Sequence, residues 1–275
     1  MEIQMNIKTS ASGRDDTRPE RSLKSVNHFN WNEDDPALTR VIQTATVPGK
    51  FSEHATPKAI AVGDFLHALA RHHIGRKDGA AAILADLPQG PRKKQNVRAV
   101  TAVGLDLDAG IDGAELDCKL AAFGMMAVRY TTHSHTPEKP KHRVILPLEF
   151  SFDLTVEGEG DHARGCALWA RIPHAVGALL GVTIDSACVD PSRAFFLPRH
   201  PKGGAHEASL FGGPLLDWRA LELAPAPSKV RKCATPEGAG LLPWLKSGGA
   251  ALQVADALET YADERIRDHA SHRLT

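Results

Sequence analysis

The stretch VRAVTAVGLDLD, residues 97–108, constrains the fold more than any other part of the chain. Its run of apolar residues is typical of a buried β-strand, and it closes on two acids separated by one residue. Neighbouring side chains of a strand point to opposite faces. Leu105 and Leu107 are therefore predicted to share one face of this strand. Asp106 and Asp108 are predicted to share the other.

The two aspartates could serve either as metal ligands or as ordinary surface acids. Two carboxylates on one strand face lie about 7 Å apart at their Cα atoms, so both can reach a small cluster of divalent cations. Without a cation they would repel each other and lose hydration, and Mg²⁺ or Mn²⁺ would compensate for both costs. The alternative is a strand end with solvated acids, followed by a turn at AGIDG (109–113).

A second stretch, residues 128–148, is predicted to form a basic hairpin. VRYTTHS and HRVILPL have the pattern of strands, and the proline-bracketed HTPEKPK between them indicates a turn. The hairpin sets seven basic or histidine side chains against one acid, Glu138: Arg129, His133, His135, Lys139, Lys141, His142 and Arg143. Such a cluster favours an anionic ligand, and phosphate suits the donors of Arg, Lys and His. A solvated hairpin tip is the alternative.

A third stretch, VTIDSACVDPSRAFFLPR (182–199), places another acid after a short apolar run. Asp190 is interpreted as a turn residue, and Arg193 is expected to pair with it or with a ligand. If Asp185 folds back onto the strand that carries Asp106 and Asp108, three carboxylates surround one point. That arrangement predicts an oxygen-ligand site for Mg²⁺ or Mn²⁺.

Charge is distributed unevenly along the chain. Lys plus Arg and Asp plus Glu each number 33, so the net charge does not predict nucleic-acid binding. Residues 71–98, however, hold seven Lys and Arg against two Asp, immediately before the candidate metal ligands. This local excess predicts contact with a polyanion, although a solvated loop remains the alternative.

The chain is expected to contain one main α/β domain with appendages at both ends. The expected segments are a flexible arm over 1–35, a catalytic domain over 36–223, a linker over 224–249 and an amphipathic helix over 250–275. Within the domain, the apolar spacing of residues 58–73 predicts a helix that opens at a proline.

The sequence also excludes some classes of protein. No apolar run has the length of a membrane span, and the N-terminus lacks the apolar core of a signal peptide, so a cytoplasmic protein without a membrane partner is expected. The four cysteines form no CxxC pair, which favours reduced thiols over a zinc site.

Taken in order, GLDLD, THSHTPEKPKHRVILPL and IDSACVDPSRAFFLPR resemble the primase-polymerase domain of the archaeo-eukaryotic primase superfamily, especially members carried by phages, plasmids and integrated elements. The resemblance runs from about residue 40 to 220. It implies an α/β (α+β) catalytic core with an RRM-like mixed or antiparallel sheet, flanking helices, and an active site between two α/β halves.

The resemblance also implies roles for individual residues. Asp106, Asp108 and Asp185 would bind two divalent metals, Mg²⁺ or Mn²⁺. In that family a Ser-x-His element contacts the triphosphate. This chain has His133-Ser134-His135 instead, so the contact is assigned to His135, with His142 or Arg143 as alternatives. Three further basic residues are expected to track template phosphates: Arg92, Lys93 and Arg98. Arg193 completes the expected nucleotide-binding set.

The function implied is nucleotidyl transfer on a single-stranded DNA template by a two-metal mechanism, from nucleoside triphosphates, in the replication of a mobile element. A helicase could act as a separate partner, since the chain has no GxxxxGK[ST] stretch. Two alternatives stay open. One is a metal-dependent nuclease. The other is an inactive primase-like module that only binds nucleic acid.

Overall fold

The structure is a computed structural model that describes residues 26–223. The predicted linker over 224–249 and the predicted C-terminal helix over 250–275 lie outside the described residues. So does most of the predicted N-terminal arm, residues 1–25.

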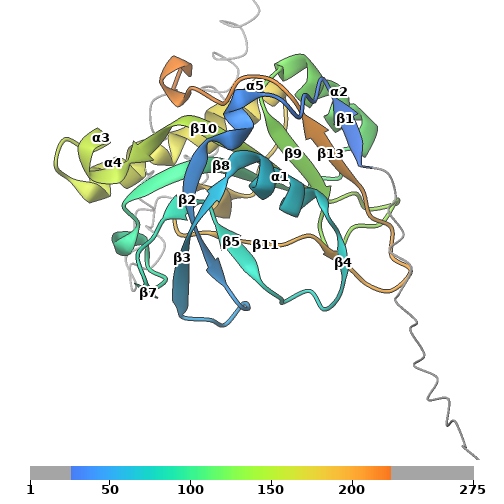
Figure 1. Ribbon diagram of the computed structural model, residues 1–275, viewed down its shortest axis with the longest axis horizontal. Coiled ribbons are helices and arrows are strands. Elements are labelled where there is room, and N and C mark those ends of the chain that lie inside the picture. The colour runs from blue at the N-terminus through green and yellow to red at the C-terminus, as the bar shows by residue number, and fades with distance from the viewer. Residues whose placement is uncertain (1–25, 224–275) are drawn as a thin grey trace, which may run out of the picture. The chain divides into compact units, whose positions relative to one another are not determined.

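The larger sheet has six strands and mixed pairing (Figure 1). Its order is β1 (Asn27–Phe29), β13 (Ala208–Phe211), β9 (Ala127–Thr131), β10 (His142–Asp153), β8 (Ala99–Leu107) and β6 (Ala85–Asp86). β1 and β13 run parallel, and the other neighbours are antiparallel. The predicted basic hairpin is thus confirmed as β9 and β10.

A second sheet contributes five strands, and a short pair stands apart from both sheets. The order of the second sheet is β11 (Ala194–Phe196), β5 (Ala81–Ile83), β2 (Val41–Val47), β3 (His54–Ala61) and β7 (Gly90–Pro91). The separate pair is β12 (Arg199–His200) with β4 (His73–Ile74), which run parallel. A single residue, Leu84, links β5 of the second sheet to β6 of the first, so the two sheets lie next to each other at this point.

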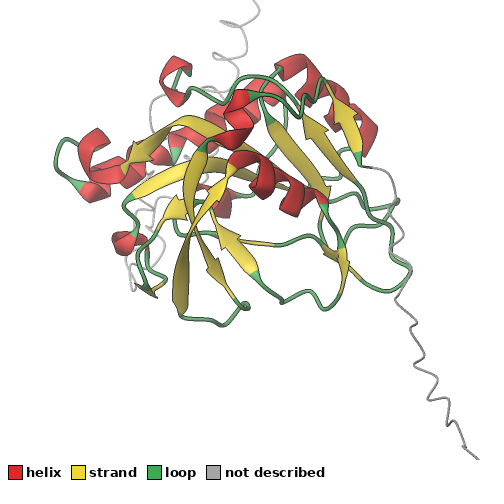
Figure 2. Cartoon of the chain, viewed as in Figure 1, coloured by secondary structure: helices red, strands yellow, loops and turns green. Residues whose placement is uncertain are grey.

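Helices cover both faces of the six-stranded sheet. The α-helices are α1 (Val62–Ala70), α2 (Gly113–Phe123), α3 (Leu154–Glu157), α4 (His162–Trp169) and α5 (Arg171–Leu180); the 3₁₀ helices are η1 (Pro36–Thr39), η2 (Lys94–Asn96), η3 (Ser186–Val189) and η4 (Trp218–Ala220). α1 contacts β9 and β13, whereas α5 contacts β8 from the opposite face. Figure 2 shows the helices gathered around this sheet and few of them near the β2–β3 hairpin. Within residues 26–223, no helix is long and apolar enough to cross a membrane.

Strand β8 alternates as its sequence predicts. Leu105 and Leu107 are buried in the core that includes α2 and α5. Gly104 and Asp106 face the second sheet. A Cβ built on Gly104 would lie 2.4 Å from Cζ of Phe195 in β11, so glycine at this position lets the second sheet approach β8 closely. The mixed α/β fold expected from the sequence is confirmed.

The helix predicted over 58–73 is wrong at its start. Residues up to Ala61 belong to β3, where Lys58 pairs with Thr44 and Ala61 with Val41 of β2. The helix begins only at Val62 and ends at Ala70. Pairing with β2 satisfies the backbone groups of residues 58–61, which outweighs the helical spacing of their side chains.

The predicted arm also needs correction within its described part. Asn27–Phe29 form β1, which pairs with β13. The ring of Phe29 stacks on that of Phe211 with centroids 4.9 Å apart. This aromatic contact and the strand pairing attach the segment to the edge of the sheet.

Candidate active site

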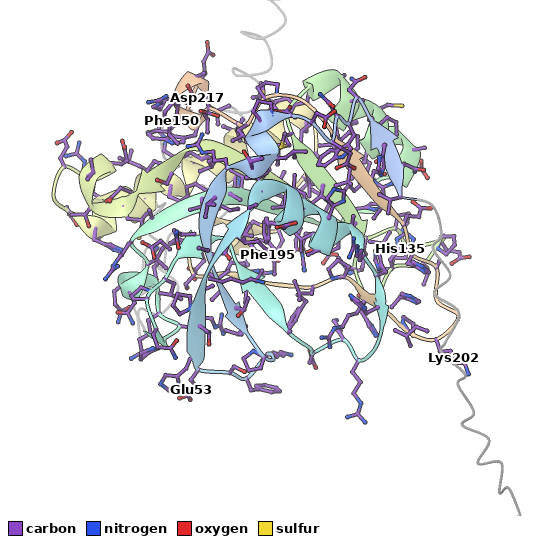
Figure 3. The ribbon with its side chains drawn as sticks, viewed as in Figure 1. Glu53, His135, Phe150, Phe195, Lys202 and Asp217 are labelled. Carbon is purple, nitrogen blue, oxygen red and sulfur yellow. The ribbon has the colours of Figure 1, made fainter. Side chains whose placement is uncertain are left out.

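Three side chains form a row across the sheet on the face that meets the second sheet. Arg143 of β10 lies directly opposite Asp106 of β8 and directly opposite Tyr130 of β9. Because register partners on one face are adjacent, the row is fixed by strand pairing rather than by loops. The Arg143 guanidinium lies 5.3 Å from the centre of the Phe195 ring, which Figure 3 labels.

Asp106 is buried and its carboxylate is fully paired. Nε of Arg143 donates to one oxygen at 2.5 Å, and an Nη2 donor of Arg193 reaches the other at 3.0 Å. Arg143 also donates to the carbonyl of Phe196 at 2.8 Å. Burial opposes the charge of Arg143, but Tyr130 and Asp106 more than offset it, so its pKa stays above the ordinary value. Arg143 therefore positions Asp106.

Asp185 does return to the strand that carries Asp106, which is the condition for three carboxylates near one point. Its backbone N–H donates to the carbonyl of Asp106 at 3.0 Å. Its side chain caps η3 and accepts from Arg193 at 3.1 Å, through the same nitrogen that contacts Asp106. One guanidinium nitrogen thus bridges two carboxylates.

Asp108 lies one residue beyond the end of β8. Its side chain is 57% exposed, and one oxygen accepts from Nζ of Lys141 at 3.1 Å. Each of the three predicted acids is therefore matched to a cation. Arg193 forms ion pairs with Asp106 and Asp185. Arg143 pairs with Asp106, and Lys141 pairs with Asp108.

These acids open into a pocket of about 350 Å³ that is lined from both sheets. The three acids are its only carboxylates, whereas seven cationic side chains line it: Lys50, Lys77, Arg92, Lys141, Arg143, Arg193 and Arg199. The volume suits a nucleotide-sized ligand. The excess of positive charge favours an anion carrying several negative charges.

The carboxylates have the right chemistry for a hard divalent cation. Oxygens of Asp106 and Asp185 already converge on a single cationic nitrogen, and Mg²⁺ and Mn²⁺ prefer oxygen ligands. They do not form a ready-made cage. Among residues 26–223, no group of three or more His, Cys, Asp or Glu is arranged to hold a metal. Arg193 lies where such a cation would bind, so binding requires that its side chain move.

The two histidines favoured from the sequence for contact with the triphosphate do not line this pocket. His133 and Ser134 line it, whereas His135 and His142 do not. Figure 3 shows His135 well apart from Phe195. Nδ1 of His135 accepts from the backbone N–H of Lys141, which turns its ring back toward the hairpin. The conformation of the 132–141 turn decides which histidine faces the pocket, and strand periodicity does not determine it.

His142 lies on the opposite face of the sheet because it neighbours Arg143 along a strand. Its ring contacts Nη1 of Arg129 and the carbonyl of Ile111. Arg129 in turn makes a buried ion pair with Asp117 of α2. Burial, together with nearby Arg129 and His135, lowers the pKa of His142 from 6.5 to about 4. His142 is therefore neutral in the folded protein at pH 7.

This lowered pKa predicts a loss of stability in acid. The unfolded chain binds a proton on His142 near pH 6.5 and the folded chain only near pH 4, so the free energy of unfolding falls as the pH drops below 6.5. We expect this group to contribute about 2 kcal/mol of loss between pH 7 and pH 5. Urea unfolding at both pH values measures it. His142→Gln, which keeps one donor and one acceptor, should remove that part of the difference, and an unchanged difference would contradict the assignment.

Only one of the three residues predicted to bind the template lies at this pocket. Arg92 lines the pocket, whereas Lys93 and Arg98 do not. Arg92 follows β7, whose pairing with β3 brings it to the second sheet. Sequence reasoning missed Lys50 and Arg199 entirely. Lys50 follows a PG turn and Arg199 sits in a two-residue strand, and neither carries a motif that would reveal it.

The sequence matches the VapE N-terminal domain over residues 56–212, which is more than half of the chain. The chain belongs to the VapE N-terminal domain family. The matched region contains all three acids of the pocket and both hairpin strands. The three motifs that carry the resemblance to a primase-polymerase domain, at residues 104–108, 132–148 and 184–199, all lie within this match.

No curated protein matches this VapE N-terminal domain. A matching solved structure is the archaeo-eukaryotic primase domain of the cyanophage S-2L primase-polymerase, at 12% identity and a TM-score of 0.36, covering 66% of this chain and 86% of that one.

Proposed function

We propose that this VapE N-terminal domain transfers nucleotides from nucleoside triphosphates to a strand growing on single-stranded DNA, as part of the replication of a phage, plasmid or integrated element. The observation that carries the proposal is the composition of the pocket. Asp106 in β8, Asp108 just beyond it and Asp185 before η3 all line one pocket, whose other charged residues are cationic.

The acids would hold the divalent cations. Asp106 and Asp185 are joined by a backbone hydrogen bond and share Arg193, so their oxygens would be the first ligands, with the exposed Asp108 completing the set. When bound, Mg²⁺ or Mn²⁺ lowers the pKa of an attacking hydroxyl and offsets charge on a triphosphate.

Other residues of the pocket would orient the nucleotide. Arg193 now pairs with Asp106 and Asp185; with those oxygens on a cation, its planar fork would be free to pair with phosphate oxygens. His133 and Ser134 also line the pocket, where the Ser134 hydroxyl can add a donor, while Nε2 of His133 contacts the carbonyl of Gly75 at 3.0 Å. Arg143, buried and held by Asp106 and the carbonyl of Phe196, stays in place and keeps Asp106 aimed into the pocket.

The test is an incorporation assay with labelled ribo- and deoxynucleoside triphosphates on primed and unprimed single-stranded DNA, with Mg²⁺ or Mn²⁺ and with chelator. Metal-dependent lengthening supports the proposal and identifies the preferred sugar. Shortening of the labelled strand would instead show that the protein is a nuclease and would contradict the proposed polymerisation. Binding of DNA without either change would leave only a nucleic-acid-binding module.

A further inference from the structure

Three of the seven cations in the pocket are not matched to an acid. Within the part of the chain that the structure describes, Lys77, Arg92 and Arg199 make no ion pair and no side-chain hydrogen bond. Nε of Arg92 is buried and has no hydrogen-bond partner. A buried donor left unpaired is costly, so this nitrogen of Arg92 indicates a ligand in the pocket that accepts from it.

Arg199 is held in position by a close fit to the backbone. It lies in β12, where it pairs with His73 of β4, and hydrogen bonds flank the pair at His73 and Gly75. A Cβ built on Gly79 would lie 1.5 Å from Nη1 and 2.1 Å from Cζ of Arg199. The guanidinium therefore occupies the space that any side chain at position 79 would fill.

We propose that Lys77, Arg92 and Arg199, here called the basic subsite, bind the phosphate tail of the incoming nucleoside triphosphate. This inference rests on the proposed function, because it places the tail in the pocket that holds the three acids. The paired cations Arg143 and Lys141 are already neutralised by Asp106 and Asp108. The basic subsite adds three charges that can match a polyphosphate, and Arg199 supplies a fork for its oxygens.

A polyphosphate tail fits this place better than a template backbone does. The subsite is part of a concave pocket of about 350 Å³, whereas a template backbone runs along an open, positively charged groove. The three cations and the three acids line the same pocket, so the end of the phosphate tail can lie near the cations while the α-phosphate lies near the acids. Gly79 is thus assigned a binding role, since it makes room for Arg199.

Two glycines of the same loop give a matched pair of variants. Neither Gly75 nor Gly79 has a positive φ, so alanine suits both backbones. At Gly75 the added Cβ would lie 3.5 Å from Cδ of Arg199, an ordinary contact, whereas at Gly79 it displaces the guanidinium. Because that group is the end of a flexible side chain, we expect Gly79→Ala to fold.

The experiment measures equilibrium binding of a fluorescent deoxynucleoside triphosphate to the full chain with Mg²⁺. Gly79→Ala and Arg199→Ala are expected to weaken binding roughly 10- to 100-fold, as for the loss of charge-assisted hydrogen bonds, and Gly75→Ala to leave it unchanged. Binding of the corresponding monophosphate and of a single-stranded oligonucleotide should change little in every variant.

Unchanged triphosphate affinity in both Gly79→Ala and Arg199→Ala would overturn the proposal. A loss of oligonucleotide affinity with triphosphate affinity intact would also overturn it and would assign the subsite to the template. Binding requires no turnover, so the outcome is separable from the proposed function. If the variants bind the triphosphate as expected but the protein incorporates no nucleotide, the proposed polymerisation is refuted. The assignment of the basic subsite to the phosphate tail is then still supported.

Discussion

Asp108→Asn is expected to lower the rate of nucleotide incorporation on the order of 10³-fold while the protein stays folded. The substitution removes a negative charge that would hold a divalent cation. Because Asp108 is 57% exposed and pairs only with Lys141, its loss should change the free energy of unfolding by less than about 1 kcal/mol. Incorporation rates and urea unfolding of the same preparations measure both effects.

Asp78→Asn is the matched control for this variant. Asp78 is also exposed and pairs with a pocket lysine, with Nζ of Lys50 4.0 Å from its carboxylate, but it does not line the pocket. Incorporation by Asp78→Asn should stay close to that of the unsubstituted protein. An equal loss in both variants would mean that general surface charge, rather than a metal ligand, accounts for the effect.

Asp106→Ala is expected to lower the free energy of unfolding by about 3–5 kcal/mol, because removing one partner leaves a charged group buried without compensation. Arg143 is buried and its Nε donates to Asp106. Its hydrogen bond to the carbonyl of Phe196 and its contacts with the rings of Tyr130 and Phe195 supply no formal negative charge. Urea unfolding monitored by circular dichroism measures the change.

Two comparisons make the prediction for Asp106→Ala specific. Asp185→Ala should cost much less, since Asp185 is partly exposed and shares Arg193 with Asp106. The double variant Asp106→Ala/Arg143→Met should recover part of the stability, because it removes the stranded charge. If Asp106→Ala unfolds no more easily than Asp185→Ala, Arg143 does not depend on Asp106 for its compensation.

Local pattern was enough to predict the acid-bearing strand. Alternation along residues 97–108 placed Leu105 in the core and Asp106 on the opposite face, and the structure agrees. The family resemblance predicted that Asp185 lies near Asp106. In the structure, the hydrogen bond from the backbone N–H of Asp185 to the carbonyl of Asp106 holds the two residues together. The alternation along β8 depends on short-range geometry, which the sequence expresses directly, whereas the contact between Asp185 and Asp106 joins distant segments.

The other wall of the pocket could not be predicted in the same way. Lys50 and Arg199 line the pocket because the second sheet packs against β8, where Gly104 leaves room for the ring of Phe195. This packing contact joins segments that are far apart in the sequence. The choice of His133 over His135 depends on the conformation of a ten-residue turn. The helix expected over 58–73 failed at its start because pairing with β2 outweighed local propensity.

The most direct test of the central claim, that Asp106, Asp108 and Asp185 hold the divalent cation for nucleotidyl transfer, is a Mn²⁺ titration of incorporation by the unsubstituted protein and by Asp185→Asn. Loss of one ligand should raise the Mn²⁺ concentration for half-maximal incorporation by about tenfold or more, while Asp78→Asn leaves it unchanged. The same half-maximal concentration in Asp185→Asn, or incorporation that persists in chelator, would contradict the claim.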